Sequence, residues 1–242
     1  MHIPGKTALV TGGGRRVGRA LALALAEAGA DVVVNYHRSA AEAADTVRDI
    51  ERLGRRALAL PADVADPEQV RGLVEATLAG FGRLDILVNN ASRFDRAPLA
   101  EITPDDWDRV LGVNLKGPFL LAQAAADALR AARGTIVNII DLSALQPWPS
   151  FIPHAVSKAG LLHLTRCLAR ALAPQVRVNA IAPGTVLPPD DFDGTDNAGG
   201  VDRRALERAG TPADVARALR YLVENDFVTG EVLVVDGGRM LL

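Results

Sequence analysis

The chain has 242 residues, and its 27 lysine and arginine residues nearly balance 29 aspartate and glutamate residues. This length suits one large α/β domain, and the charge balance gives no sign of a nucleic-acid or anionic-membrane partner. The single cysteine, Cys167, excludes an intrachain disulfide, and with no apparent signal peptide or membrane-spanning run it favours a cytoplasmic protein.

The first predicted element is a short strand from Lys6 to Thr11, followed by the turn and helix TGGGRRVGRALALALAEAGA. Glycines such as Gly12 and Gly18 let backbone N–H groups approach an anion, and the helix N-terminus adds partial positive charge. A strand before the turn and a second strand after the helix supply the context that a dinucleotide site requires. The segment predicts a pyrophosphate-binding turn.

The second strand is predicted from Asp31 to Asn35 and ends in the sequence NYHRS. An NAD-selective site would place Asp or Glu near this point to bind the ribose 2′-hydroxyl, and none is present. His37, Arg38 and Ser39 offer groups suited to a 2′-phosphate, which favours NADPH. The alternative is that these three are solvated loop residues that open the next helix.

The middle of the chain continues the alternation of helix and strand. A helix to about Leu53 precedes a strand from Arg55 to Leu60, and Asp66 starts an amphipathic helix that reaches Phe81. LDILVNNAS predicts a buried strand followed by a polar loop. Thr103 then starts a capped helix whose apolar pattern continues past Asn114 to about Ala131.

Three titratable residues follow the β-branched strand from Thr135 to Ile140. Asp141 stands directly after the strand, and His154 and Lys158 are four residues apart on the helix that Pro153 begins. A carboxylate at a strand end can therefore face an imidazole and an ammonium group, an arrangement suited to proton transfer. The alternative is that these three polar residues have no common function.

The helix from Pro153 to about Ala173 is apolar nearly all round, so we expect it in a deep core or a subunit interface, with Cys167 as a small residue there. After the strand VRVNAIAPG, a Pro- and Gly-rich stretch at about 185–203 is a candidate substrate loop. A helix capped by Thr211 and the strand EVLVVDGG complete the chain. The alternation predicts one α/β domain over 1–242: a Rossmann fold with a doubly wound, seven-stranded parallel sheet and helices on both faces.

Taken together, these segments resemble the short-chain dehydrogenase/reductase family along the whole chain, through TGGGRRVG, ADV, NNA, Asn114, the Lys158 helix, VNAIAPG and VTGEVLVVDGG in that order. Within it the chain is most similar to pteridine reductases: Arg16 replaces the middle glycine of the turn, YHRSAAEA resembles their 2′-phosphate segment, and Asp141 stands where most members have Ser.

The resemblance implies NADPH as the cofactor, a pterin-like small-molecule substrate and a homotetramer, with no metal. It implies substrate contacts for Arg16, Phe94 and Asp141, with the pterin stacked on the phenyl face, and catalytic roles for Asp141, His154, Lys158 and Asn114. Lys158 would hold the nicotinamide ribose, and Asn114 would support Lys158 through water. The implied cofactor residues are Gly12, Arg16, Val17, Gly18, His37, Arg38, Ser39, Asp63, Val64, Asn90, Ala91, Ser92, Lys158, Pro183 and Gly184.

The departure from the family pattern is His154, in His-Ala-Val-Ser-Lys, where the family has Tyr-x-x-x-Lys. An imidazolium is a competent acid near neutral pH, and a carboxylate beside it favours that form. We therefore expect an Asp141–His154 pair as proton donor. Two other interpretations remain open: an NADPH-dependent carbonyl or 3-oxoacyl reductase, and an NADPH-binding protein with weak catalysis.

Overall fold

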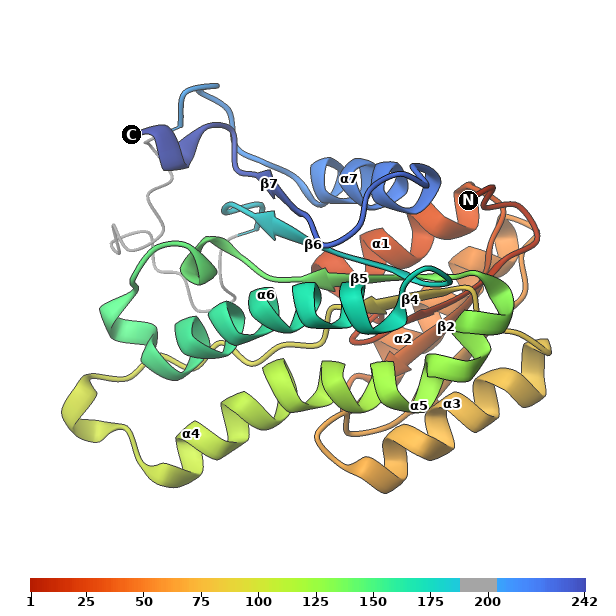
Figure 1. Cartoon of the computed structure of the whole chain (residues 1–242), viewed down its shortest axis with the longest axis horizontal. Coiled ribbons are helices and arrows are strands. Elements are labelled where there is room, and N and C mark those ends of the chain that lie inside the picture. The colour runs from red at the N-terminus through yellow and green to blue at the C-terminus, as the bar shows by residue number, and fades with distance from the viewer. Residues whose placement is uncertain (188–203) are drawn as a thin grey trace.

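The computed structural model describes residues 1–187 and 204–242. Its centre is a seven-stranded, all-parallel sheet in the order β3-β2-β1-β4-β5-β6-β7 (Figure 1). The predicted doubly wound α/β fold is thereby confirmed. The strands are β1 (Thr7–Val10), β2 (Asp31–Tyr36), β3 (Ala57–Pro61), β4 (Ile86–Asn89), β5 (Thr135–Ile139), β6 (Arg177–Pro183) and β7 (Val232–Val235).

Helices cover both faces of the sheet. One apolar core joins the sheet to α1, α2 and α7, and a second joins it to α3, α5 and α6. Both cores consist of β-branched strand residues packed on one apolar stripe of each helix, as expected of strands buried on two faces. The helices are α1 (Arg16–Glu27), α2 (Ala40–Arg52), α3 (Pro67–Phe81), α4 (Pro104–Leu111), α5 (Gly117–Ala132), α6 (Ile152–Leu172) and α7 (Pro212–Glu224).

Two helix starts have the cap that their sequences predict. The Asp66 carboxylate accepts hydrogen bonds from the backbone N–H groups of Glu68 and Gln69. Thr103 and Asp106 form a reciprocal capping box at the start of α4. These caps satisfy N–H groups that the helix itself leaves without partners.

The helix predicted from Thr103 to about Ala131 is interrupted. Between α4 and α5 the chain forms a π-helical turn, Gly112–Lys116, with Asn114 buried inside it. A Cβ atom on Gly117 would lie 3.0 Å from a methyl group of Val64, so the chain after β3 packs tightly against the end of this turn. A π turn adds one residue to the helix, but the buried face continues on both sides of it. Apolar periodicity therefore does not reveal such a turn.

Helix α6 is not buried all round, and Cys167 is not a core residue. Its inner side is buried through residues such as Leu161 and Leu172, whereas Val156 is 43% exposed and Cys167 is exposed. The interpretation as a deep core helix was therefore wrong for this chain by itself. The exposed side of the helix is mixed: Val156, Ala159 and Cys167 lie there together with His163, Arg166 and Arg170.

A line of buried polar side chains crosses the sheet toward α6. The amide Nδ2 of Asn89 on β4 donates to Oδ1 of Asn138 on β5 at 2.8 Å. Asn138 in turn donates to the Thr165 hydroxyl at 2.9 Å. All three side chains lie in the interior, where polar groups need such partners.

Within residues 1–187 and 204–242, no helix combines the length and the apolar character needed to cross a lipid bilayer.

Candidate active site

The candidate site lies at the carboxyl ends of the strands, where β1 and β4 are neighbours and the strand order reverses direction. Open α/β sheets bind ligands at such a switch point. The segments predicted to bind cofactor and substrate follow the first six strands, β1 to β6, so the sheet brings their starting points to one edge.

The glycine turn after β1 has the close packing of a nucleotide cradle. Gly12 has a φ of +59°, and a Cβ atom on Gly18 would lie 2.1 Å from the carbonyl oxygen of Gly12. Asn90 holds the turn from β4 by donating to the carbonyl oxygens of Thr11 and Gly12. The turn leads into the N-terminus of α1, so the described residues fit a dinucleotide pyrophosphate.

Arg16 occupies the left-handed region of backbone space, with a φ of +53°. This conformation costs a residue with a side chain roughly 1–2 kcal/mol and costs glycine almost nothing. The backbone thus keeps a conformation that suits glycine while the residue carries an exposed guanidinium side chain. Such strain at the first residue of α1 is typical of a binding site.

The segment after β2 offers a cationic edge. His37 and Arg38 are exposed, and Ser39 is the N-cap residue of α2, with no side-chain hydrogen bond to the helix. Nε2 of His37 lies 4.0 Å from a carboxylate oxygen of Asp63, which follows β3. A helix N-terminus with a nearby guanidinium group suits a phosphate.

Asp141 and His154 are in direct contact, as their positions predict. Nε2 of His154 lies 2.6 Å from Oδ2 of Asp141. The other carboxylate oxygen, Oδ1, accepts hydrogen bonds from the backbone N–H and the hydroxyl of Ser143. The His154 side chain is 2% exposed and that of Asp141 is 21% exposed, so the carboxylate is the outer member of the pair.

The surroundings stabilise the charged form of Asp141. Burial alone would raise the pKa of this carboxyl group, but the hydrogen bond and charge of His154, then Lys158 and Ser143, lower it to about 2. Burial lowers the pKa of the Lys158 ammonium group, and the Asp141 carboxylate partly offsets this. A partly buried carboxylate beside a histidine and a lysine is a pattern that functional sites share with structural ion pairs.

Asn114 lies beside the pair but contacts different partners from those predicted. Its Oδ1 accepts the Arg93 backbone N–H at 2.7 Å, and its Nδ2 donates to the Arg93 carbonyl oxygen and to the Ser157 hydroxyl, both at 3.0 Å. Lys158 Nζ instead donates to the carbonyl oxygen of Ile139 at 2.9 Å. A water link from Asn114 to Lys158 stays a prediction.

Phe94 belongs to an aromatic group that the sequence analysis missed. Its ring is 43% exposed and stacks on Phe151, with ring centroids 4.3 Å apart. Its edge-to-face neighbours are Trp148, at 6.3 Å, and His154, at 4.7 Å. The guanidinium of Arg239 lies 6.0 Å from the Trp148 ring. Trp148 and Phe151 were visible as aromatics in QPWPSF, but no periodic pattern links that loop to Phe94.

The remaining predicted residues also lie along this edge. Val64 is buried after β3, the Ala91 N–H donates to the Thr11 hydroxyl, and Ser92 is exposed. Val17 is partly buried at the start of α1, and Pro183 is the last residue of β6. Most of the predicted substrate loop, 188–203, lies outside the described residues.

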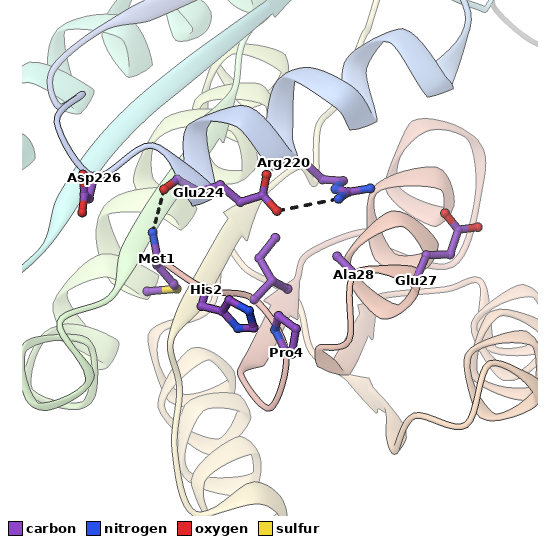
Figure 2. Close-up of a pocket in the computed structure, with 9 residues that line it drawn as sticks. Met1, His2, Pro4, Glu27, Ala28, Arg220, Glu224 and Asp226 are labelled. Carbon is purple, nitrogen blue, oxygen red and sulfur yellow. Dashed lines mark hydrogen bonds and ion pairs between the residues drawn. The ribbon is translucent and has the colours of Figure 1, made fainter.

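Two cavities differ in their relation to this edge. One of about 270 Å³ is lined by Gly184, at the end of β6, and by Asp236, after β7. A wider one of about 680 Å³ lies where the chain enters β1, between the ends of α1 and α7 (Figure 2). There the Met1 amino group donates to the Glu224 carbonyl oxygen and Arg220 pairs with Glu224. The larger cavity is at the opposite end of the strands from Asp141.

Comparisons with known proteins agree with the geometry. Residues 13–239 match the family described as "Enoyl-(Acyl carrier protein) reductase". The chain is 40% identical over 243 residues (97% of this chain, 96% of the relative) to a putative ketoacyl reductase of granaticin polyketide synthase from Streptomyces violaceoruber. It is 36% identical over 244 residues (98% and 97%) to a 3-oxoacyl-[acyl-carrier-protein] reductase from Synechocystis.

A solved structure is similar along nearly the whole chain. A short-chain dehydrogenase from Burkholderia cenocepacia, in complex with NADP, superposes with a TM-score of 0.92 at 40% identity, covering 99% of this chain and 100% of that one. The fold and the nucleotide turn thus define a dinucleotide-binding oxidoreductase. The chain belongs to the short-chain dehydrogenase/reductase family.

Proposed function

We propose that the protein is an NADPH-dependent reductase that reduces a C=N bond of a flat, dihydropterin-like heterocycle. The observation that carries the proposal is the Asp141–His154 pair, which places a carboxylate at the strand end beside the partly exposed ring of Phe94. A carboxylate can pair with the N–H groups of a heterocycle, and an exposed phenyl face can stack on it.

NADPH would be held by the turn around Gly12 and Gly18, by Arg38 and Ser39 at its 2′-phosphate, and by Lys158 at the nicotinamide ribose. When bound, it supplies the hydride. The NADP in the Burkholderia relative supports this choice, as does the absence of an acidic residue between β2 and α2.

The chain's own residues then orient the substrate and supply a proton. Phe94 packs on the ring, and Arg16 lies between the pyrophosphate turn and the substrate. The Asp141–His154 pair, in which His154 takes the position of the family's tyrosine, gives a proton to the nitrogen that gains negative charge. General acid catalysis by a positioned side chain contributes about 10²–10⁴-fold to a rate.

The experiment is NADPH oxidation with 7,8-dihydrobiopterin at several pH values, for the wild type and for Phe94→Ala. We expect turnover in the wild type and a KM for the pterin at least about tenfold higher in Phe94→Ala, because one stacking face is lost. Leu99→Ala, at an exposed site further along the same loop, is the matched control. A wild type silent with every dihydropterin would rule out this substrate class.

A second candidate is a carbonyl or 3-oxoacyl reductase, which the names of the two ketoacyl-reductase relatives favour. The same assay with a 3-oxoacyl thioester and a panel of ketones separates the two functions. Turnover of the thioester without any turnover of dihydropterins would select the second candidate.

We also propose a homotetramer built through α5 and α6. Its support is two exposed apolar side chains, Val156 on α6 and Phe119 on α5, each 43% exposed. The cytoplasmic location inferred from the single cysteine stays a prediction.

A further inference from the structure

The hydrogen bonds around His154 determine which of its ring nitrogens carry protons. The reciprocal bonds between Asn114 and the Arg93 backbone fix the orientation of the Asn114 amide, because the Arg93 N–H requires an oxygen as its acceptor. Both Nδ2 hydrogens of Asn114 are then used, on the carbonyl oxygen of Arg93 and on the Ser157 hydroxyl, whose own hydrogen goes to the His154 carbonyl oxygen.

His154 Nδ1 therefore has an acceptor, not a donor, in front of it. It lies 2.9 Å from the Arg93 carbonyl oxygen, and its 3.3 Å approach to Asn114 Nδ2 is a contact with a nitrogen whose hydrogens point elsewhere. Nδ1 must carry a proton, because a bare nitrogen facing a carbonyl oxygen at this distance would leave two lone pairs opposed.

The other ring nitrogen faces a second acceptor. With Nδ1 protonated, a neutral ring would place the bare Nε2 lone pair 2.6 Å from the Asp141 carboxylate oxygen. A hydrogen bond this short requires a proton between the two atoms. The ring has one further proton, shared with Asp141, and neither N–H points toward solvent because the side chain is 2% exposed.

We propose that Asp141 is the catalytic residue that touches the substrate and that His154 is a positioning residue, an imidazolium held by the Arg93 carbonyl, which supplies the proton through Asp141. The inference rests on the proposed reductase function. In the step, the Nε2–H bond of His154 breaks, an O–H bond forms on Asp141, and the carboxyl group passes a proton to the substrate atom that has gained an electron pair. The pair is left as neutral imidazole and carboxylate, and it regains one proton from water at the exposed side of Asp141.

The charged groups around the pair are consistent with this direction of transfer. Lys158 on α6 interacts with the Asp141 carboxylate and has its own hydrogen bond to Ile139. The guanidinium of Arg93 is paired with Asp95, so only the backbone of Arg93 acts on His154. Ser143 donates to Oδ1 and leaves Oδ2 for the shared proton.

The first test needs no activity. Nitrogen-15 spectra of histidine-labelled protein, with His154→Phe for assignment, report the protons on each ring nitrogen. We expect both nitrogens of His154 to be protonated at neutral pH, and Nε2 to lose its proton in Asp141→Asn while Nδ1 keeps its own. The same proton count on the ring in the wild type and in Asp141→Asn would overturn the proposal.

The second test separates the two roles by single-turnover rates of NADPH oxidation. We expect Asp141→Asn to lower the rate at least about 100-fold with NADPH affinity unchanged. His154→Gln, which keeps an N–H for Asp141, should lower it about tenfold and make the rate rise as the pH falls, because water must then protonate the carboxyl group.

A rate unaffected in Asp141→Asn but abolished in His154→Gln would make His154 the direct donor and overturn the assignment. If the wild type reduces neither dihydropterins nor carbonyls, the reductase function fails, whereas the spectra still decide whether the shared proton exists.

Discussion

Asp141 couples the stability of the fold to pH. Its pKa falls from the usual 3.8 to about 2 in the folded chain, so the folded state binds its proton less readily than the unfolded state. The resulting stabilisation is fully present above pH 3.8 and is lost as the pH falls through about 2. By linkage it amounts to about 2 kcal/mol at neutral pH.

We therefore predict that Asp141→Asn unfolds about 2 kcal/mol more easily than the wild type at pH 7, with the difference shrinking between pH 4 and pH 2. Urea denaturation at fixed pH values measures it. Asp127→Asn is the control, since that side chain is fully exposed and its change should have little effect at any pH. A difference independent of pH would show that the loss comes from packing alone.

Arg38 should govern the choice of cofactor. Replacing it by Ala removes a cation from the edge beside α2, so we predict a rise of about tenfold or more in the KM for NADPH with little change for NADH, because only the former has the 2′-phosphate. Arg48→Ala, on the exposed side of α2, is the control. Equal losses with both cofactors would place Arg38 away from the 2′ position.

For single residues, the sequence predicted which residue types form the site better than it predicted which atoms they contact. Asp141 and His154 could be paired from a strand end and the first turn of the next helix. The Arg93 carbonyl could not be identified as an acceptor, because every residue has a carbonyl group and only the tertiary fold selects one. Ser157 was missed for a related reason. In the sequence, a serine three residues after His154 does not differ from any other helix residue, and only the fold brings it to Asn114.

At the scale of elements, two helix glycines have opposite roles. A Cβ on Gly18 would lie 2.1 Å from the Gly12 carbonyl oxygen, whereas one on Gly72, inside α3, has nothing within 4 Å. The first glycine is required by packing of the nucleotide turn. The second is a helix-interior residue that alanine can replace.

We predict that Gly18→Ala abolishes NADPH binding and destabilises the fold by about 2 kcal/mol or more, because the turn must open. Gly72→Ala should instead stabilise the protein by up to about 1 kcal/mol and leave binding unchanged. Thermal unfolding and cofactor fluorescence titration measure both effects. Tight NADPH binding by Gly18→Ala would contradict this account of the turn.

The helices and strands could be predicted from apolar periodicity and from the Gly, Pro and capping residues between them. The predicted boundaries were a few residues off. The third strand was predicted from Arg55 and runs over Ala57–Pro61, because its first residues continue the turn that ends α2. The π-helical turn at Asn114 could not be predicted, since the hydrogen bonds of Asn114 to Arg93 and Ser157 join residues that are distant in sequence.

At the scale of the whole molecule, the proposed tetramer predicts the effect of adding a charge at its interface. If α5 and α6 form the tetramer interface, Phe119→Glu and Val156→Glu should each shift the protein to smaller species, because a charge would be buried against an apolar partner. Leu53→Glu, at an apolar site with 45% exposure after α2, is the control. Light scattering after size exclusion gives the mass, and an unchanged mass for both interface variants would locate assembly elsewhere.

The order of the sheet was predictable because alternating strands and helices allow few doubly wound arrangements. The sequence did not reveal how neighbouring strands are held in register. Strands such as β4 and β5 are buried on both faces and mostly apolar, so a shifted pairing would still bury hydrophobic side chains.

The buried line from Asn89 through Asn138 to Thr165 distinguishes the native pairing from such shifts. In the native register each side chain makes at least one hydrogen bond, with Asn89 opposite Asn138, and of the buried amide atoms in this line only Asn89 Oδ1 has no partner. A slip of one residue would leave amides unpaired in the interior, at roughly 1–3 kcal/mol for each group. These three residues therefore act against misfolding: they add little to the attraction that forms the sheet, and they raise the energy of its nearest incorrect alignments.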